Sequence, residues 1–197
     1  MASTFTGGLP LMPTSGGRSM TWVGNEAGEP GRLQGLGPVA GPGTRLLLLG
    51  SFPGVASLRA QQYYGHPRNQ FWPILSALWQ QDLTALPYAE RLVLMQAHGL
   101  GLWDVYGACR RQGSLDSAIE AAEPNDLRGL VGGLPRLLAI AHNGGESARA
   151  MKLTATLGRP VHRLPSTSPA NASWSFERKL AAWRAVFAQH GLANDSA

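Results

Sequence analysis

The sequence has few of the residues that support redox, metal or amine chemistry. It contains one cysteine, Cys109, which excludes an internal disulfide and a four-cysteine zinc or iron–sulfur site. The only lysines are Lys152 and Lys179, so Schiff-base chemistry has few possible nucleophiles. Neither an apolar run near the roughly 18–20 residues of a membrane span nor a secretory signal is present. We therefore expect a cytoplasmic protein with no membrane segment and no cofactor.

The histidine spacing bears on metal binding, and the net charge bears on the kind of partner. His98, His162 and His190 are scattered without metal-ligand spacing, so no metal site is expected. The formal net charge is +5 and the pI is about 10.0, which favours polyanionic partners. Because many basic proteins bind no nucleic acid, the charge alone leaves the partner open.

Glycine and proline mark a change in the chain near Thr44. Eleven glycines and five prolines fall in residues 1–44, whereas the remaining 153 residues hold 14 glycines and nine prolines. The apolar residues of the leading segment show no period, and glycine raises the entropic cost of ordering it. The composition predicts a disordered extension over 1–44, or a segment that docks on DNA or a partner, followed by one folded domain over 45–197.

From residue 45 onward, short apolar runs alternate with segments of helical period. Such alternation is typical of strand-helix-strand units on a parallel sheet. The expected strands cover 46–49, 100–105, 137–141 and 161–164, and the expected helices cover 71–79, 88–98, 145–153 and 176–187. The fold class is therefore α/β: a three-layer α/β/α sandwich with a central, mostly parallel sheet of about four strands.

Ligands of such sheets bind beyond the carboxyl ends of the strands, where three loops should meet. The loops begin at Gly50, Asn143 and Pro165. The first lacks GxxxxGK[ST] and GxGxxG, so it is not a nucleotide phosphate loop. Its Tyr63-Tyr64 pair suits a core as well as the stacking of a planar ligand. Asn-Gly at 143–144 and the hydroxyl-rich 166–168 likewise suit plain turns as well as ligand contacts.

Together these motifs resemble the uracil-DNA glycosylase superfamily, in particular its DNA-deoxyinosine (hypoxanthine-DNA) glycosylase branch. The resemblance runs from about Pro38 to Trp183. It rests on GSFPG at 50–54, YYGHPRNQFW at 63–72, WDV at 103–105, GSLDSAI at 113–119, the Asn143-Gly144 strand end and STSPANA at 166–172. The long first motif combined with STSPAN makes the resemblance specific.

The resemblance implies roles for single residues. Mismatch-specific relatives orient the attacking water with an asparagine in the first loop, but the matching position here is Phe52. The deoxyinosine branch is thought to use the later asparagine, which is Asn69 here. Tyr64 matches the residue that stacks on the extruded base. His142 stands where relatives often have phenylalanine, which affects the packing behind Asn143.

These residue types suit the removal of a deaminated base. The carboxamide of Asn143 can pair with an edge that presents C=O beside N–H, as hypoxanthine and uracil do and adenine and cytosine do not. The neutral amide of Asn69 can position water against the sugar but cannot be a strong base. Neither lysine lies in the three loops. The sequence therefore predicts a monofunctional, monomeric DNA glycosylase acting on hypoxanthine, uracil or xanthine and leaving an abasic site.

The remaining site expectations are grouped by role. Residues expected around the base, besides Tyr64 and Asn143, are Gly50, Ser51, Phe52 and His66. Residues expected to contact DNA are Pro53, Gly54, Arg68, Ser166, Thr167, Ser168, Pro169 and Asn171. His66 could instead order its loop, and Asp104 and Asp116 are candidates for loop-ordering hydrogen bonds rather than for catalysis. The alternatives are a non-catalytic nucleic-acid-binding module and a serine hydrolase using Ser51 or Ser166, although no GxSxG elbow exists.

Overall fold

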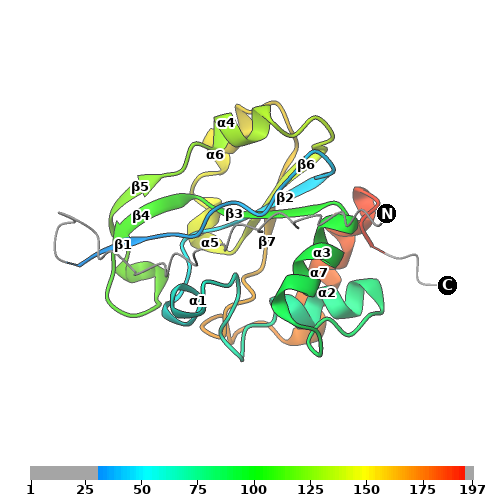
Figure 1. Cartoon of the computed structure of the whole chain (residues 1–197), viewed down its shortest axis with the longest axis horizontal. Coiled ribbons are helices and arrows are strands. Elements are labelled where there is room, and N and C mark those ends of the chain that lie inside the picture. The colour runs from blue at the N-terminus through cyan, green and yellow to red at the C-terminus, as the bar shows by residue number, and fades with distance from the viewer. Residues whose placement is uncertain (1–30, 194–197) are drawn as a thin grey trace, which may run out of the picture.

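A parallel sheet forms the centre of the computed structural model, which describes residues 31–193 (Figure 1). Its strands are β2 (Leu46–Gly50), β3 (Leu100–Asp104), β6 (Ala139–Asn143) and β7 (Val161–Leu164), in the order β3-β2-β6-β7. All neighbouring pairs are parallel. The expected strands at 46–49, 100–105 and 161–164 are confirmed. The strand expected at 137–141 lies two residues later, as β6. Asn143 therefore ends strand β6 instead of following it.

Alternate side chains of β2 enter two different cores. Leu46 and Leu48 pack with α2 (Phe71–Trp79), α3 (Tyr88–Ala97) and α7 (Phe176–Gln189) on one face. Leu47 and Leu49 pack on the other face, with residues of α4 (Leu127–Gly132) and the loop that follows it. All four leucines are fully buried. Helices thus cover both faces of the sheet (Figure 1), which confirms the predicted three-layer α/β/α fold.

A second sheet, which the sequence did not predict, lies beside the first. It is antiparallel and contains β1 (Arg32–Gln34), β4 (Tyr106–Arg110) and β5 (Glu120–Pro124), in the order β1-β4-β5. Val39 also exchanges two backbone hydrogen bonds of 2.9 Å with Leu102. The boundary predicted near Thr44 is therefore wrong for residues 31–44, because backbone pairing orders them despite their glycine content. Residues 1–30 lie outside the described part of the chain.

Helices follow the expected pattern with two changes. The segment after Asn143 divides into α5 (Gly145–Ala148) and α6 (Met151–Ala155), and the short α1 (Val55–Ala60) was not predicted. Ser175 caps the N-terminus of α7, and its side chain accepts a hydrogen bond from the Arg178 amide. Among residues 31–193, no helix has the length and apolar character to cross a bilayer.

Candidate active site

A cavity of about 670 Å³ lies at the carboxyl ends of β2, β3 and β6, and all three predicted loops line it. This volume falls within the roughly 300–1,000 Å³ typical of ligand pockets. Tyr64, Asn69 and Asn143 share the cavity. The other predicted site residues that line it are Gly50, Ser51, Phe52, Pro53, Gly54, His66, Ser166, Thr167, Ser168, Pro169 and Asn171. Arg68 does not line it and is exposed.

The Asn143 carboxamide is held by a network of hydrogen bonds. Its Nδ2 donates to the Thr167 hydroxyl at 3.0 Å and to the Tyr64 hydroxyl at 3.1 Å. Its Oδ1 accepts from the Thr167 amide at 3.1 Å. Both donors of the side chain are therefore engaged, and one lone pair of Oδ1 remains. The network fixes the direction in which the amide presents its donor and acceptor.

Tyr64 combines an unusual backbone with a partly buried ring. Its φ is 55°, in the left-handed region that non-glycine residues rarely adopt. The ring stacks on Phe71 with centroids 3.9 Å apart, and burial raises the pKa of its hydroxyl. The hydroxyl accepts from Asn143 and keeps its own proton for donation. Since Phe71 covers one face of the ring, only the other face can meet a base.

Asn69 and His66 both belong to the segment before α2. Asn69 Oδ1 accepts a hydrogen bond of 3.0 Å from the Phe71 amide, at the start of that helix. His66 Nδ1 accepts one of 3.1 Å from the Arg68 amide. An accepting Nδ1 leaves Nε2 as the protonated nitrogen of a neutral ring. His66 thus orders its loop and also lines the cavity.

The third loop is tied to the body of the protein. Lys179, only 2% exposed, donates from Nζ to Gln70 Oε1 at 2.8 Å and to the Asn171 carbonyl at 2.9 Å. Trp183 donates to the Pro165 carbonyl at 3.1 Å. Thr167, expected to contact DNA, is fully buried. Its amide and hydroxyl face Asn143 instead, which is a different role from the predicted one.

Two glycines permit close approaches at the cavity. A Cβ atom at Gly50 would clash with Asp104 Oδ1, and it would lie 3.8 Å from the Tyr64 hydroxyl oxygen. Gly144 has a φ of 102°, and a Cβ there would lie 2.9 Å from Ser166 Cβ. The first glycine therefore makes room for a carboxyl group, and the second for the third loop.

Asp104 lies in a place that its expected role, the ordering of a loop, does not explain. It is 4% exposed, lines the cavity at the end of β3, and its Oδ2 has no hydrogen-bond partner among the described residues. The pKa of the carboxyl group is raised to about 7. Burial is the main cause and Asp116 adds to it, whereas the Tyr63 hydroxyl and Arg111 oppose the increase.

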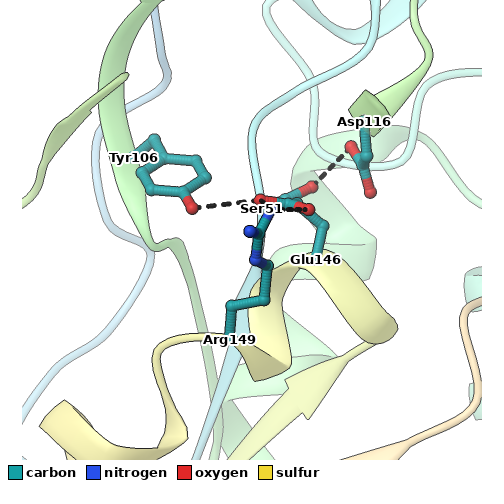
Figure 2. Close-up of polar contacts among 5 residues, drawn as sticks. All are labelled: Ser51, Tyr106, Asp116, Glu146 and Arg149. Atoms are coloured by element: carbon teal, nitrogen blue, oxygen red, sulfur yellow. Dashed lines mark hydrogen bonds and ion pairs between the residues drawn. The ribbon is translucent and has the colours of Figure 1, made fainter. Parts of the chain in front are cut away.

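Ser51 and Ser166 lack the partners of a catalytic serine. Ser51 donates to Asp116 Oδ1 at 2.7 Å, as Figure 2 shows. Ser166 accepts from the Ser168 amide at 3.2 Å. Neither serine has a histidine among these partners, so the contacts do not support the serine-hydrolase alternative.

Figure 2 also shows a neighbouring polar contact in which Tyr106 donates to Glu146 at 3.1 Å, and Arg149 pairs with the same carboxylate.

Phe52 is 5% exposed beneath the Arg111 guanidinium, whose carbon lies 5.0 Å from the ring centroid. A packing role accounts for Phe52 as well as contact with a base does. Among residues 31–193, no three His, Cys, Asp or Glu side chains are grouped to hold a metal ion.

His142 points away from Asn143 into the protein. Its Nδ1 lies 2.8 Å from Ser147 Oγ, and its Nε2 lies 2.9 Å from Thr154 Oγ1. Ser147 donates its own proton to the Leu49 carbonyl, so Nδ1 carries the imidazole proton. Burial lowers the pKa of His142 to about 4. The residue anchors α5 and α6 behind β6, which resolves how the strand end packs without phenylalanine.

Comparison with known proteins decides the family. The model of the family described as "Uracil DNA glycosylase superfamily" matches residues 38–188, most of the chain. This chain belongs to the uracil DNA glycosylase superfamily. The predicted resemblance is thereby confirmed.

The match with two relatives in the superfamily extends over nearly the whole length of each relative. Two proteins named hypoxanthine DNA glycosylase are similar to it. The Methanosarcina barkeri protein is 36% identical over 156 residues, covering 79% of this chain and 98% of its own. The Methanosarcina acetivorans protein is 38% identical over 154 residues, covering 78% and 97%.

A solved structure of the superfamily is also similar. It is the solution NMR structure of a Methanosarcina acetivorans protein described as a candidate uracil DNA glycosylase, with a TM-score of 0.74 and 36% identity. The match covers 81% of this chain and 99% of that one.

Proposed function

We propose that this protein is a monofunctional DNA glycosylase that removes deaminated bases, hypoxanthine foremost, and leaves an abasic site. The observation that carries the proposal is the meeting of Tyr64, Asn69 and Asn143 in one cavity large enough for a base. The names of the two Methanosarcina relatives support hypoxanthine as the base. Uracil and xanthine are further substrates to test.

In this mechanism, the target nucleotide leaves the duplex, at a cost of a few kcal/mol in stacking and pairing. The face of Tyr64 opposite Phe71 stacks on the base, an interaction worth about 1–3 kcal/mol. Asn143 Nδ2 donates to the base carbonyl in place of the Tyr64 hydroxyl, and the free lone pair of Oδ1 accepts the base N–H. Adenine would leave these groups unpaired, at roughly 1–3 kcal/mol for each.

The chemical step is hydrolysis of the N-glycosidic bond. Water adds its oxygen to C1′ of the sugar, and the base departs with the bonding electron pair and takes up a proton. Asn69 Oδ1 accepts from the Phe71 amide and has a second lone pair to orient the water. Lys179 is buried against Gln70 and Asn171 and does not line the cavity, which favours water over an amine as nucleophile.

We place the DNA backbone over the mouth of the cavity and propose a monomer acting in the cytoplasm. Arg163 lines the cavity and is exposed, and the exposed Arg68 lies in the first loop. Each phosphate that such a residue neutralises should steepen the salt dependence of binding by about 0.9 in log–log slope. Sedimentation with and without a DNA duplex measures the oligomeric state.

The decisive experiment compares duplexes that hold deoxyinosine, deoxyuridine or deoxyxanthosine, with alkali used to reveal abasic sites. The Asn69→Ala variant should release base at least about tenfold more slowly, a change of about 1.4 kcal/mol, with little change in DNA affinity. An unchanged rate would remove Asn69 from the mechanism. Strand breaks without alkali would contradict the monofunctional assignment. Binding without base release by the wild type would favour the non-catalytic module.

A further inference from the structure

Three strand ends lie at one level of the sheet, and two of them present polar side chains. Gly50 at the end of β2 is paired in register with Asp104 of β3, and Asn143 ends β6 on the opposite side of β2. Parallel strands in register direct paired side chains to the same face of the sheet. The carboxyl group of Asp104 and the carboxamide of Asn143 thus flank Gly50, and both line the cavity.

The two groups differ in their hydrogen bonds. The Asn143 amide is engaged by Thr167 and Tyr64, whereas Asp104 Oδ2 has no partner within residues 31–193 and is buried. An unpaired buried polar atom is costly, and in a native structure it calls for an explanation. Because Asp104 lines the ligand cavity, the simplest explanation is a ligand with a group that pairs with its carboxyl group.

We propose that Asp104 is a second base-contacting residue, which in its neutral form donates its O–H to the carbonyl of the extruded base. This inference rests on the proposed function. The departing base becomes negatively charged, so a donor beside its carbonyl stabilises the transition state more than the ground state. An ionised Asp104 would have no donor and would repel that charge. A carboxylic acid kept neutral by an apolar site can fill this role.

The surroundings of Asp104 favour the neutral form near neutral pH. Burial is the main cause, and Asp116 of the 3-10 helix η1 (Asp116–Ala118) adds a like charge. Arg111, which follows β4, and the Tyr63 hydroxyl oppose them, and the balance leaves the pKa at about 7. The neighbouring Tyr64 hydroxyl stays protonated, because burial raises its pKa as well.

The test measures single-turnover release of hypoxanthine from a deoxyinosine duplex between pH 5.5 and 8.5. Wild type should lose rate as the pH rises through about 7. Asp104→Ala should be slower by about 100-fold at pH 6, the usual effect of one lost donor to a developing oxyanion. Asp104→Asn keeps a donor at every pH, so its rate relative to wild type should rise with pH. The ratio cancels any titration of the DNA itself.

The matched control is Asp126→Asn, the same chemical change at the N-cap of α4 and outside the cavity. Its rate relative to wild type should be constant across the pH range. Binding of a duplex with 2′-fluoro-2′-deoxyinosine, which resists hydrolysis, gives a second readout. Wild-type affinity should fall above pH 7, and that of Asp104→Asn should not.

Each other outcome decides against the proposal in a recognisable way. A ratio of Asp104→Asn to wild type that does not change with pH, or an Asp104→Asn rate no higher than that of Asp104→Ala, would overturn the role of Asp104 and leave the proposed function standing. No base release by wild type from any of the deaminated duplexes would overturn both. If Asp104→Ala fails to fold, the Asp104→Asn ratio carries the test alone.

Discussion

His142 and Asp104 are two buried ionisable groups near the ends of the strands that flank β2, and their surroundings differ. His142 is fully buried, and both of its ring nitrogens have hydroxyl partners. Asp104 is 4% exposed, and its Oδ2 has none among the described residues. Burial favours the neutral form of each, with pKa values of about 4 and about 7. The comparison teaches that burial alone does not mark a functional group, because both residues are buried and only Asp104 lines the cavity.

The largest expected effect on stability concerns Asp104. Its folded pKa is raised above the ordinary 3.8, so its stabilising contribution is complete below about pH 4 and is lost as the pH rises to about 7. The loss amounts to up to about 4 kcal/mol. Asp104→Asn should remove it and unfold at higher urea concentration than wild type at pH 8. Parallel pH dependences of the two proteins would contradict the buried, neutral carboxyl group.

His142 should act with the opposite sign. Its folded pKa is depressed, so its contribution is complete above about pH 6.5 and is lost as the pH falls towards 4, by up to about 3 kcal/mol. His142→Gln should abolish this acid loss of stability in urea unfolding. Base release by the folded variant at pH 7 should stay within about threefold of wild type. A far larger loss of rate would show that His142 contributes to base release and not only to stability.

Asn143 sharpens the comparison, because both N–H groups of its amide are engaged and yet it lines the cavity. Thr167→Val removes the hydroxyl that fixes Nδ2 and keeps the backbone amide that fixes Oδ1. One hydrogen bond of about 0.5–1.5 kcal/mol corresponds to a two- to tenfold slower release of hypoxanthine. Thr167→Ser should restore the rate. If the valine variant kept the full rate, the hydrogen bond from Asn143 Nδ2 to the Thr167 hydroxyl would not contribute to base release.

Much of this architecture could be predicted from local patterns. The four-leucine run of β2 and the helical stripe from Phe71 to Trp79 predict elements whose burial does not depend on distant residues. Strand ends can then be aligned, and the shared cavity of Tyr64, Asn69 and Asn143 follows from the ligand-binding edge of such sheets.

The rest depends on pairing between distant segments. Strand β1 is polar and short, and it is ordered by its hydrogen bonds with β4 and by the ion pair of Arg32 with Glu123 of β5. The inward direction of Thr167 and the missing partner of Asp104 follow from side-chain contacts across strands that no spacing in the sequence reveals. The sequence signal available for Asp104 was its place at a strand's carboxyl end, the same signal that identified Asn143.

The close approach at Gly50 links two positions that lie far apart in the chain. Any larger residue at position 50 would occupy the space of the Asp104 carboxyl group. The side-chain volumes at the two positions are therefore coupled. A library that varies position 50 alone will sample mostly proteins in which the new side chain collides with the Asp104 carboxyl group. Altering the range of excised bases from this side of the cavity requires that positions 50 and 104 be varied as a pair.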